Sequence, residues 1–136
     1  YGNWTPVMAG GTSAGTYAPS EQQGHYVKVG KQVTAWFNLS NIATTSAGSG
    51  ALYLTGLPFT INWQDTFNGA GIGSAELNYF SGISGDTIVV LGSDNTDFLL
   101  FYHSTGTNNL SSLINVTDKN SDSADIRGFV TYYTGG

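Results

Sequence analysis

The chain has 136 residues, of which 40% are hydrophobic and only 10% are charged, and its formal net charge at pH 7 is -5. Four Lys and Arg residues are too few to neutralise a run of phosphates, so the composition argues against nucleic acid as a partner. The absence of cysteine excludes disulfides and thiolate metal sites. The sequence also has no run of about 18 apolar residues of the kind that predicts a membrane-spanning helix. This length predicts a single domain, residues 1–136, with a real core.

The N-terminal residues, YGNWTPV, have neither an initiator Met nor a signal-peptide pattern, so we interpret the chain as a fragment of a longer protein. Trp4 is expected to anchor the first strand. Residues 11–15, GTSAG, match the GxSxG nucleophile motif, but a Gly- and Thr-rich segment follows where that motif requires a helix. His25 and His103 lie in separate strand contexts, which is typical of edge residues. We therefore predict no enzymatic activity and no catalytic residues.

Residues 25–40, HYVKVGKQVTAWFNLS, alternate between apolar and polar side chains, as expected of strands with one buried face. The step at residues 29–31 predicts a turn or a bulge. The residues expected to be buried are Val33, Ala35, Phe37 and Leu39. Trp36 lies on the opposite, polar face, where it is either a platform for a ligand or a contact between subunits; we favour the contact.

Residues 50–56, GALYLTG, predict a strand that ends in the sequence GLPF. Pro58 cannot donate a backbone hydrogen bond and fixes its own φ at about -65°, so the chain must leave the sheet at or just after Gly56. Leu57 and Phe59 are too apolar for a solvent-exposed loop and are expected to fold over one open end of the core. A positive φ at Gly56 would make Gly56→Val strongly destabilising.

Four further strands are predicted, separated by clusters of Gly, Asn, Asp and Ser that supply turns: residues 74–82, 86–93, 97–104 and 125–134. Short strands that recur behind turn signals are typical of an all-β sandwich or barrel. The strands at 86–93 and 97–104 are apolar on both faces. Their second face is therefore expected to be covered, either because they lie centrally in the sheet or because another subunit packs on them.

Trp63 lies just past the GLPF corner, in the segment TINWQDTFNGAGIG. Saccharide sites combine an aromatic ring, against which C–H groups pack, with amide and carboxylate partners for the hydroxyls. Such polar groups surround Trp63: Asn62, Gln64, Asp65 and Asn68. Together with Trp36, these residues are the predicted ligand-binding residues. The alternative is that Trp63 is a loop aromatic that caps the core.

Two acidic clusters have the oxygen-rich composition of calcium loops: Asp94, Asn95 and Asp97, and Asp118, Asn120, Asp122 and Asp125. The second cluster departs from the EF-hand pattern, because Ser123 stands where Gly is required and Phe129 where Glu is required. We interpret both clusters as solvated turn acids. No metal site and no cofactor are predicted.

Several segments occur in an order that resembles the C-terminal receptor-binding modules of bacteriophage tail fibres and tailspikes: GNWTPVMAGGTSAGTY, QQGHYVKVGKQVTAWFNLS, GSGALYLTGLPF and LINVTDKNSDSADIRGFVTYYT. They span nearly the whole chain, while residues 62–112 match no pattern of these modules. The resemblance implies an all-β sandwich, trimeric, displayed at the distal end of a virion fibre and in contact with host-surface glycans.

We therefore expect an all-β, antiparallel, jelly-roll-like sandwich that assembles as a homotrimer. The predicted function is non-enzymatic host recognition at the tip of a tail fibre or tailspike, with bacterial surface polysaccharide as the ligand. The alternatives are a structural domain that trimerises and caps an upstream shaft, a cell-surface lectin or cytokine-like sandwich, and a small hydrolase.

Overall fold

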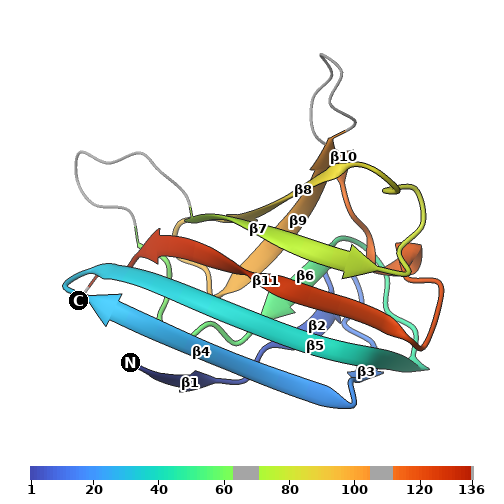
Figure 1. Cartoon of the computed structure of the whole chain (residues 1–136), viewed down its shortest axis with the longest axis horizontal. Coiled ribbons are helices and arrows are strands. Elements are labelled where there is room, and N and C mark those ends of the chain that lie inside the picture. The colour runs from blue at the N-terminus through green and yellow to red at the C-terminus, as the bar shows by residue number, and fades with distance from the viewer. Residues whose placement is uncertain (63–70, 105–111, 136) are drawn as a thin grey trace.

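A computed structural model describes residues 1–62, 71–104 and 112–135 of the chain (Figure 1). Within these ranges the protein consists of β-strands and one short 3-10 helix, η1 (Val116–Asp118). The strands are β1 (Gly2–Trp4), β2 (Val7–Gly10), β3 (Thr16–Ala18), β4 (Glu21–Val29), β5 (Gln32–Ser46), β6 (Leu52–Thr55), β7 (Gly71–Asn78), β8 (Thr87–Gly92), β9 (Phe98–Ser104), β10 (Ser112–Leu113) and β11 (Ala124–Tyr133). The predicted all-β class is confirmed.

All the strand pairs are antiparallel, and the sheet has the order β1-β4-β5-β11-β7-β8-β9-β6-β2, with β3 paired to β5 and β10 to β9. The sheet curls over on itself. In Figure 1 the long strands β4, β5, β11 and β7 form the front layer, and β9, β6 and β2 cross behind them. The two layers enclose the core, which agrees with the predicted sandwich.

The N-terminal segment contributes a strand to both ends of this sheet order. β1 pairs with β4 in the front layer, and β2 pairs with β6 in the rear layer. Pro6 lies between the two strands and cannot donate to a ladder, which allows the chain to pass from one layer to the other there. Trp4 fixes this passage: its Nε1 donates to the carbonyl oxygens of His25 and Trp36, each at 3.1 Å. The predicted anchoring role of Trp4 is confirmed.

The alternation in the longest strand decides which side chains enter the core. In β5, Val33, Ala35, Phe37 and Leu39 are all buried, as predicted. Gly30 and Lys31 form the turn between β4 and β5, so the predicted break at residues 29–31 is a hairpin turn. The rear layer contributes Leu99 and Phe101 of β9 to the same core.

The strands that are apolar on both faces lie in the interior of the sheet. β8 pairs with β7 and β9, and β9 pairs with β8 and β6. Their inward residues, Val90 and Phe101 among them, are buried, whereas the outward apolar residues of both strands are half-buried. Both strands therefore lie centrally in the sheet, as the first explanation requires, and the covering of their outward faces by another subunit stays a prediction.

The GLPF corner has the predicted geometry. Gly56 has a φ of 91°, in the left-handed region that favours glycine. The next residue, Leu57, is buried in the core cluster, and Phe59 packs against that cluster at its edge. The Leu57 amide donates to the Asp97 carbonyl at 3.1 Å, which joins the corner to the start of β9.

Strand boundaries differ from the predicted ones where pairing, and not composition, decides them. β5 continues to Ser46 because β3 and β11 both pair with its second half. β7 begins at Gly71, three residues before the predicted strand, and ends at Asn78 because Tyr79 has a φ of 63°. The short strands β1, β2, β3 and β10 have too few residues to show a period.

Tyr132 is buried to 1% exposure, and its hydroxyl has no hydrogen-bond partner with acceptable geometry in the part of the chain that is described. Burial raises the pKa of this hydroxyl to about 12, and the nearby Phe59 backbone acts in the opposite direction more weakly.

An unpartnered buried hydroxyl is destabilising, so Tyr132→Phe is expected to raise the free energy of unfolding by about 1 kcal/mol. The folded-state pKa lies above the ordinary value of 10.0, so the neutral hydroxyl favours folding below that pH, and wild-type stability falls as the pH rises from 10.0 to about 12. This fall is expected to shrink in the variant. Thermal unfolding at neutral and alkaline pH measures both effects, and a destabilised variant would show that the hydroxyl has a partner.

Candidate functional site

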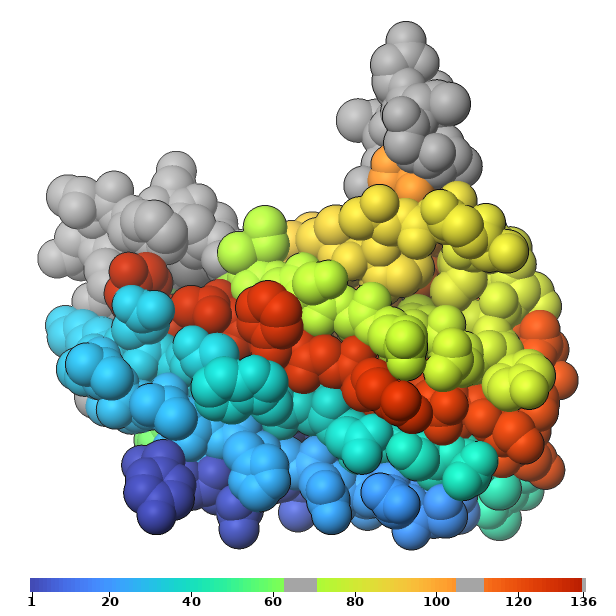
Figure 2. All heavy atoms as spheres, in the orientation of Figure 1, coloured from blue at the N-terminus to red at the C-terminus, as the bar shows by residue number. Residues whose placement is uncertain are grey.

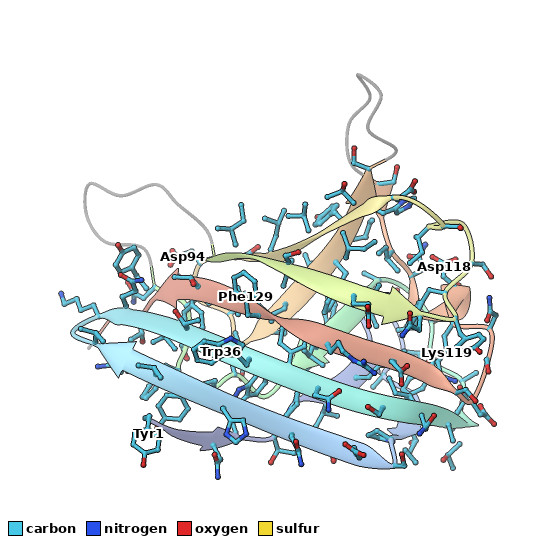
Figure 3. All side chains as sticks on the ribbon, in the orientation of Figure 1. Tyr1, Trp36, Asp94, Asp118, Lys119 and Phe129 are labelled. Atoms are coloured by element: carbon cyan, nitrogen blue, oxygen red, sulfur yellow. The ribbon has the colours of Figure 1, made fainter. Side chains whose placement is uncertain are left out.

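An apolar patch lies on the outer side of the front layer. Its members are Val27 on β4, Trp36 on β5, Phe129 on β11 and Ile72 on β7, each with 41% to 60% of its surface exposed. We call these four residues the aromatic face. In Figure 3, Trp36 and Phe129 lie side by side on the viewer's side of β5 and β11, and Figure 2 shows the broad surface that these strands form.

The sheet register assembles the aromatic face from four strands. His25, Trp36, Phe129 and Ser74 are successive cross-strand partners. The next row along the strands consists of Val27, Thr34, Thr131 and Ile72. Directly opposed side chains are neighbours on one face of an antiparallel sheet, so Trp36 and Phe129 form a single aromatic surface.

A shallow depression of about 300 Å³ adjoins the two rings. Gln23, His25 and Asn38 contribute polar groups to its lining, beside Trp36 and Phe129. Aromatic surface with amide groups at its margin is suited to two kinds of partner: a saccharide ring, or an apolar surface of another protein chain.

The two rows of the aromatic face contain no Asp, Glu, Lys or Arg. Charge begins one row further along, where Arg127 pairs with Glu76 at 3.5 Å and with Asp125 at 3.4 Å. A surface without charged groups costs little free energy to dehydrate, and the core of a protein interface is likewise depleted of charged residues.

The predicted saccharide site near the GLPF corner is only partly described. Asn62 lies beside the C-terminal strand, where its backbone N–H donates to the Tyr133 carbonyl at 2.8 Å. Tyr133 is four residues along β11 from Phe129, the partner of Trp36, so Asn62 and Trp36 lie on different parts of the surface. The predicted residues Trp63, Gln64, Asp65 and Asn68 lie outside the described residues.

Phe129 is the residue that the sequence interpretation missed. The signal was present: in β11 the residues at positions 127, 129, 131 and 133 alternate with the buried Ile126, Val130 and Tyr132. The period of two therefore places Phe129 on the outer face. Only the register with β5 shows that it lies opposite Trp36.

The second acidic cluster is tied into the backbone of neighbouring elements. Asp118 accepts a hydrogen bond from the Asn115 amide at 3.0 Å at the start of η1. Asp122 accepts from the Thr44 amide at 3.2 Å, and Asp125 accepts from the Asn41 amide at 3.0 Å. In the first cluster, the Asn95 side chain donates to Asp94 at 3.3 Å. Among the described residues, no group of His, Asp and Glu has the arrangement of a metal site.

These contacts change the acidity of two carboxyl groups. The hydrogen bond from the Thr44 backbone, together with Lys119, lowers the pKa of Asp122. Partial burial acts to raise the pKa of Asp125, but the hydrogen bonds from Asn78 and the Asn41 backbone, with the charge of Arg127, outweigh it and lower this pKa. Both groups are therefore held in the ionised form as part of the fold.

The residues of the GxSxG motif and the two histidines lie apart. Ser13 forms an isolated bridge with Ser49. His25 lies on the outer face of β4, with its Nδ1 2.8 Å from Asn3 Oδ1. His103 lies on β9, with its Nδ1 2.7 Å from Asp86 Oδ2. In the described ranges there is also no helix with the length and apolarity needed to cross a bilayer.

No protein-family model matches the sequence, and no curated protein matches it either. Among solved structures, the chain is similar to the crystal structure of the Dettilon tailspike protein, with a TM-score of 0.69 and 19% sequence identity. The likeness covers 95% of this chain and 23% of the tailspike chain, so the present chain spans about a quarter of the tailspike's length. The protein has the fold of a domain found in a phage tailspike.

Proposed function

We propose that the chain is a non-enzymatic host-recognition module of a bacteriophage tail, which assembles as a homotrimer and binds bacterial surface saccharide. The aromatic face is the observation that carries this proposal. The tailspike-like fold over 95% of the chain supports the location on a virion tail.

The aromatic face supports self-association. It places two aromatic and two aliphatic side chains on a flat sheet surface, and its two rows contain no formal charge. Depletion of charge with enrichment of aromatic residues is what distinguishes the centre of a protein interface from other surface. Copies of one chain usually assemble with closed symmetry, so in a trimer we expect this face to pack against a different part of the next copy around the three-fold axis.

The composition supports a neutral saccharide as the ligand. Only 10% of the residues are charged, so the surface presents mainly amide, hydroxyl and aromatic groups, which are the groups that contact sugars. A single sugar contact is weak. A trimer that is displayed several times on one virion raises the effective concentration at the cell surface, so weak sites are sufficient.

The double substitution Trp36→Ser and Phe129→Ser is expected to convert the oligomer to a monomer, because it removes both rings from the aromatic face. Light scattering at micromolar concentration measures the change. Leu113→Ser, which removes an exposed apolar residue from β10, is the matched control and is expected to leave the oligomer intact. A wild-type chain that is already monomeric in this experiment would contradict the proposed trimer.

A second function, structural trimerisation and capping of an upstream shaft without a ligand, is favoured by the same face, because a face used only between copies needs no sugar. A bacterial glycan array separates the two functions. Binding by the wild-type oligomer supports host recognition, whereas an intact oligomer that binds no glycan supports the structural role.

A further inference from the structure

The sheet splits open between β7 and β8. The two strands pair only from Gly71 with Gly92 to Ser74 with Val89. Beyond this point β7 continues along β11 as far as Asn78, while the first part of β8 pairs, among the described strands, only with β9. Figure 1 shows the two strands diverging toward the loop that connects them.

A cavity of about 400 Å³ lies in this split. The apolar part of its lining includes Phe80, Ile83 and Ile88, which are buried, and the half-buried Ala75 and Leu77. The polar part includes Glu76, Asn78, Ser84 and Asp86. The volume is enough for one sugar ring and its hydroxyls, at the small end of the usual range for ligand sites.

The split leaves strand edges facing the cavity. Residues 75–78 pair with β11 on one side, and their other side faces β8 without a ladder partner in the described sheet. In an antiparallel strand, alternate residues direct their N–H and C=O groups to opposite sides. Part of the backbone of residues 75–78 is therefore directed at the cavity, where it can hydrogen-bond to the hydroxyls of a ligand.

Tyr79 stands at the margin of the cavity with 58% of its surface exposed. Its φ of 63° lies in the left-handed region, which is unfavourable for a bulky side chain. Neighbouring contacts hold this conformation: the Asn120 amide donates to the Tyr79 carbonyl at 2.9 Å, and the Ser81 amide donates to the Asp118 carbonyl at 2.7 Å. The backbone that carries the Tyr79 ring is therefore fixed on both sides.

The charge at the cavity selects against anions. Glu76 and Asp86 are part of its lining, and none of the described lining residues carries a positive charge. Asp86 Oδ2 lies 2.7 Å from His103 Nδ1, whereas Glu76 is largely exposed, accepts a hydrogen bond from the Asn78 side chain at 3.4 Å and lies 3.5 Å from Arg127. A carboxylate of this kind accepts hydrogen bonds from sugar hydroxyls and repels uronic acids and phosphorylated sugars.

We propose that this cavity binds one neutral hexose unit, with the Tyr79 ring packed against a C–H face of the sugar and Glu76 accepting hydrogen bonds from its hydroxyls. The inference rests on the proposed function in taking a surface saccharide as the ligand. It does not use the aromatic face, because none of the four residues of that face lines the cavity.

The test is a titration of the full chain, labelled with ¹⁵N, with the methyl glycosides of glucose, galactose and mannose, and with glucuronate as the anionic probe. At least one neutral glycoside is expected to shift the amide signals of residues 76–86 with a millimolar Kd, and glucuronate is expected to shift them less. Glu76→Gln is expected to weaken binding of the neutral glycoside and to reduce the discrimination against glucuronate.

Tyr79→Asn removes the ring and introduces a residue that tolerates the left-handed conformation, so the variant is expected to fold. Binding is expected to weaken by about tenfold or more. Tyr79→Phe keeps the ring and is expected to retain most of the affinity. Tyr1→Ala, which removes a fully exposed tyrosine from another part of the surface, is the control and is expected to change nothing.

Shifts that cluster away from residues 76–86, or unchanged affinity in Tyr79→Asn, would overturn the assignment of this cavity while leaving the proposed function in place. If no glycoside binds the chain and the glycan array is also negative, both saccharide recognition and the binding of a hexose in this cavity are contradicted. Binding to the array without any effect of Tyr79→Asn or Glu76→Gln places the sugar elsewhere.

Discussion

Gly56→Val is expected to lower the free energy of unfolding by about 3 kcal/mol or more. Gly56 has a φ of 91°, which a β-branched residue adopts only at a cost of about 1 to 3 kcal/mol. In addition, a Cβ at this position would lie 2.5 Å from the Thr5 carbonyl oxygen. Thr5 belongs to the passage between β1 and β2, so the backbone there has to move for the side chain to fit.

Gly82→Val is the matched control for this prediction. Gly82 has a φ of 79°, but no atom of the described residues lies within 4 Å of an added Cβ. It therefore carries the backbone cost without the contact, and a loss of about 1 to 2 kcal/mol is expected. Urea denaturation of both variants at one protein concentration measures the difference. Equal losses would show that the contact with Thr5 contributes nothing.

Phe101→Ala is expected to cost about 3 to 5 kcal/mol, the usual range for truncating a fully buried aromatic residue. Phe101 projects from β9 in the rear layer and meets Phe37 of β5 in the front layer edge to face, with ring centroids 6.1 Å apart. Phe37 in turn meets Trp4 at 6.5 Å. Loss of the Phe101 ring therefore leaves a cavity where the two layers are joined.

Phe98→Ala on the same strand is the comparison. Phe98 points to the opposite face of β9, where it is half-buried and stacks on Tyr53 with centroids 4.3 Å apart. Its truncation is expected to cost about 1 kcal/mol, because less apolar area is lost and water fills the space. Tryptophan fluorescence during urea denaturation follows both variants. Similar costs at the two positions would contradict the assignment of Phe101 to the joint between the layers.

Several elements of the fold could be predicted from local sequence, because a strand with one buried face has apolar and polar residues in alternation. The alternation over residues 32–39 identified the buried face of β5, and the glycine and proline of GLPF located the end of β6. Short strands such as β1 and β10 could not be found in this way. They form because they can pair with the free edge of a longer neighbouring strand, and the local sequence contains no information about that edge.

The candidate surfaces were less accessible to prediction. Trp36 was identified from its place on the polar face of β5, but Phe129 lies 93 positions away in the sequence and meets it only through the register of β5 and β11. The cavity at the β7 and β8 split gave no signal at all, because a split between two strands is a property of their pairing and not of their composition. Residues 74–82 were interpreted as a plain strand.

The sequence by itself determined the all-β class, the inward face of the long strands and the place where the chain leaves the sheet at the GLPF corner, since each depends on residues within one turn or one strand of each other. Only the tertiary structure decided which strands are neighbours, where the aromatic face forms and where the sheet opens beside Tyr79. These features depend on the register between distant segments, which is set by the packing of the whole core.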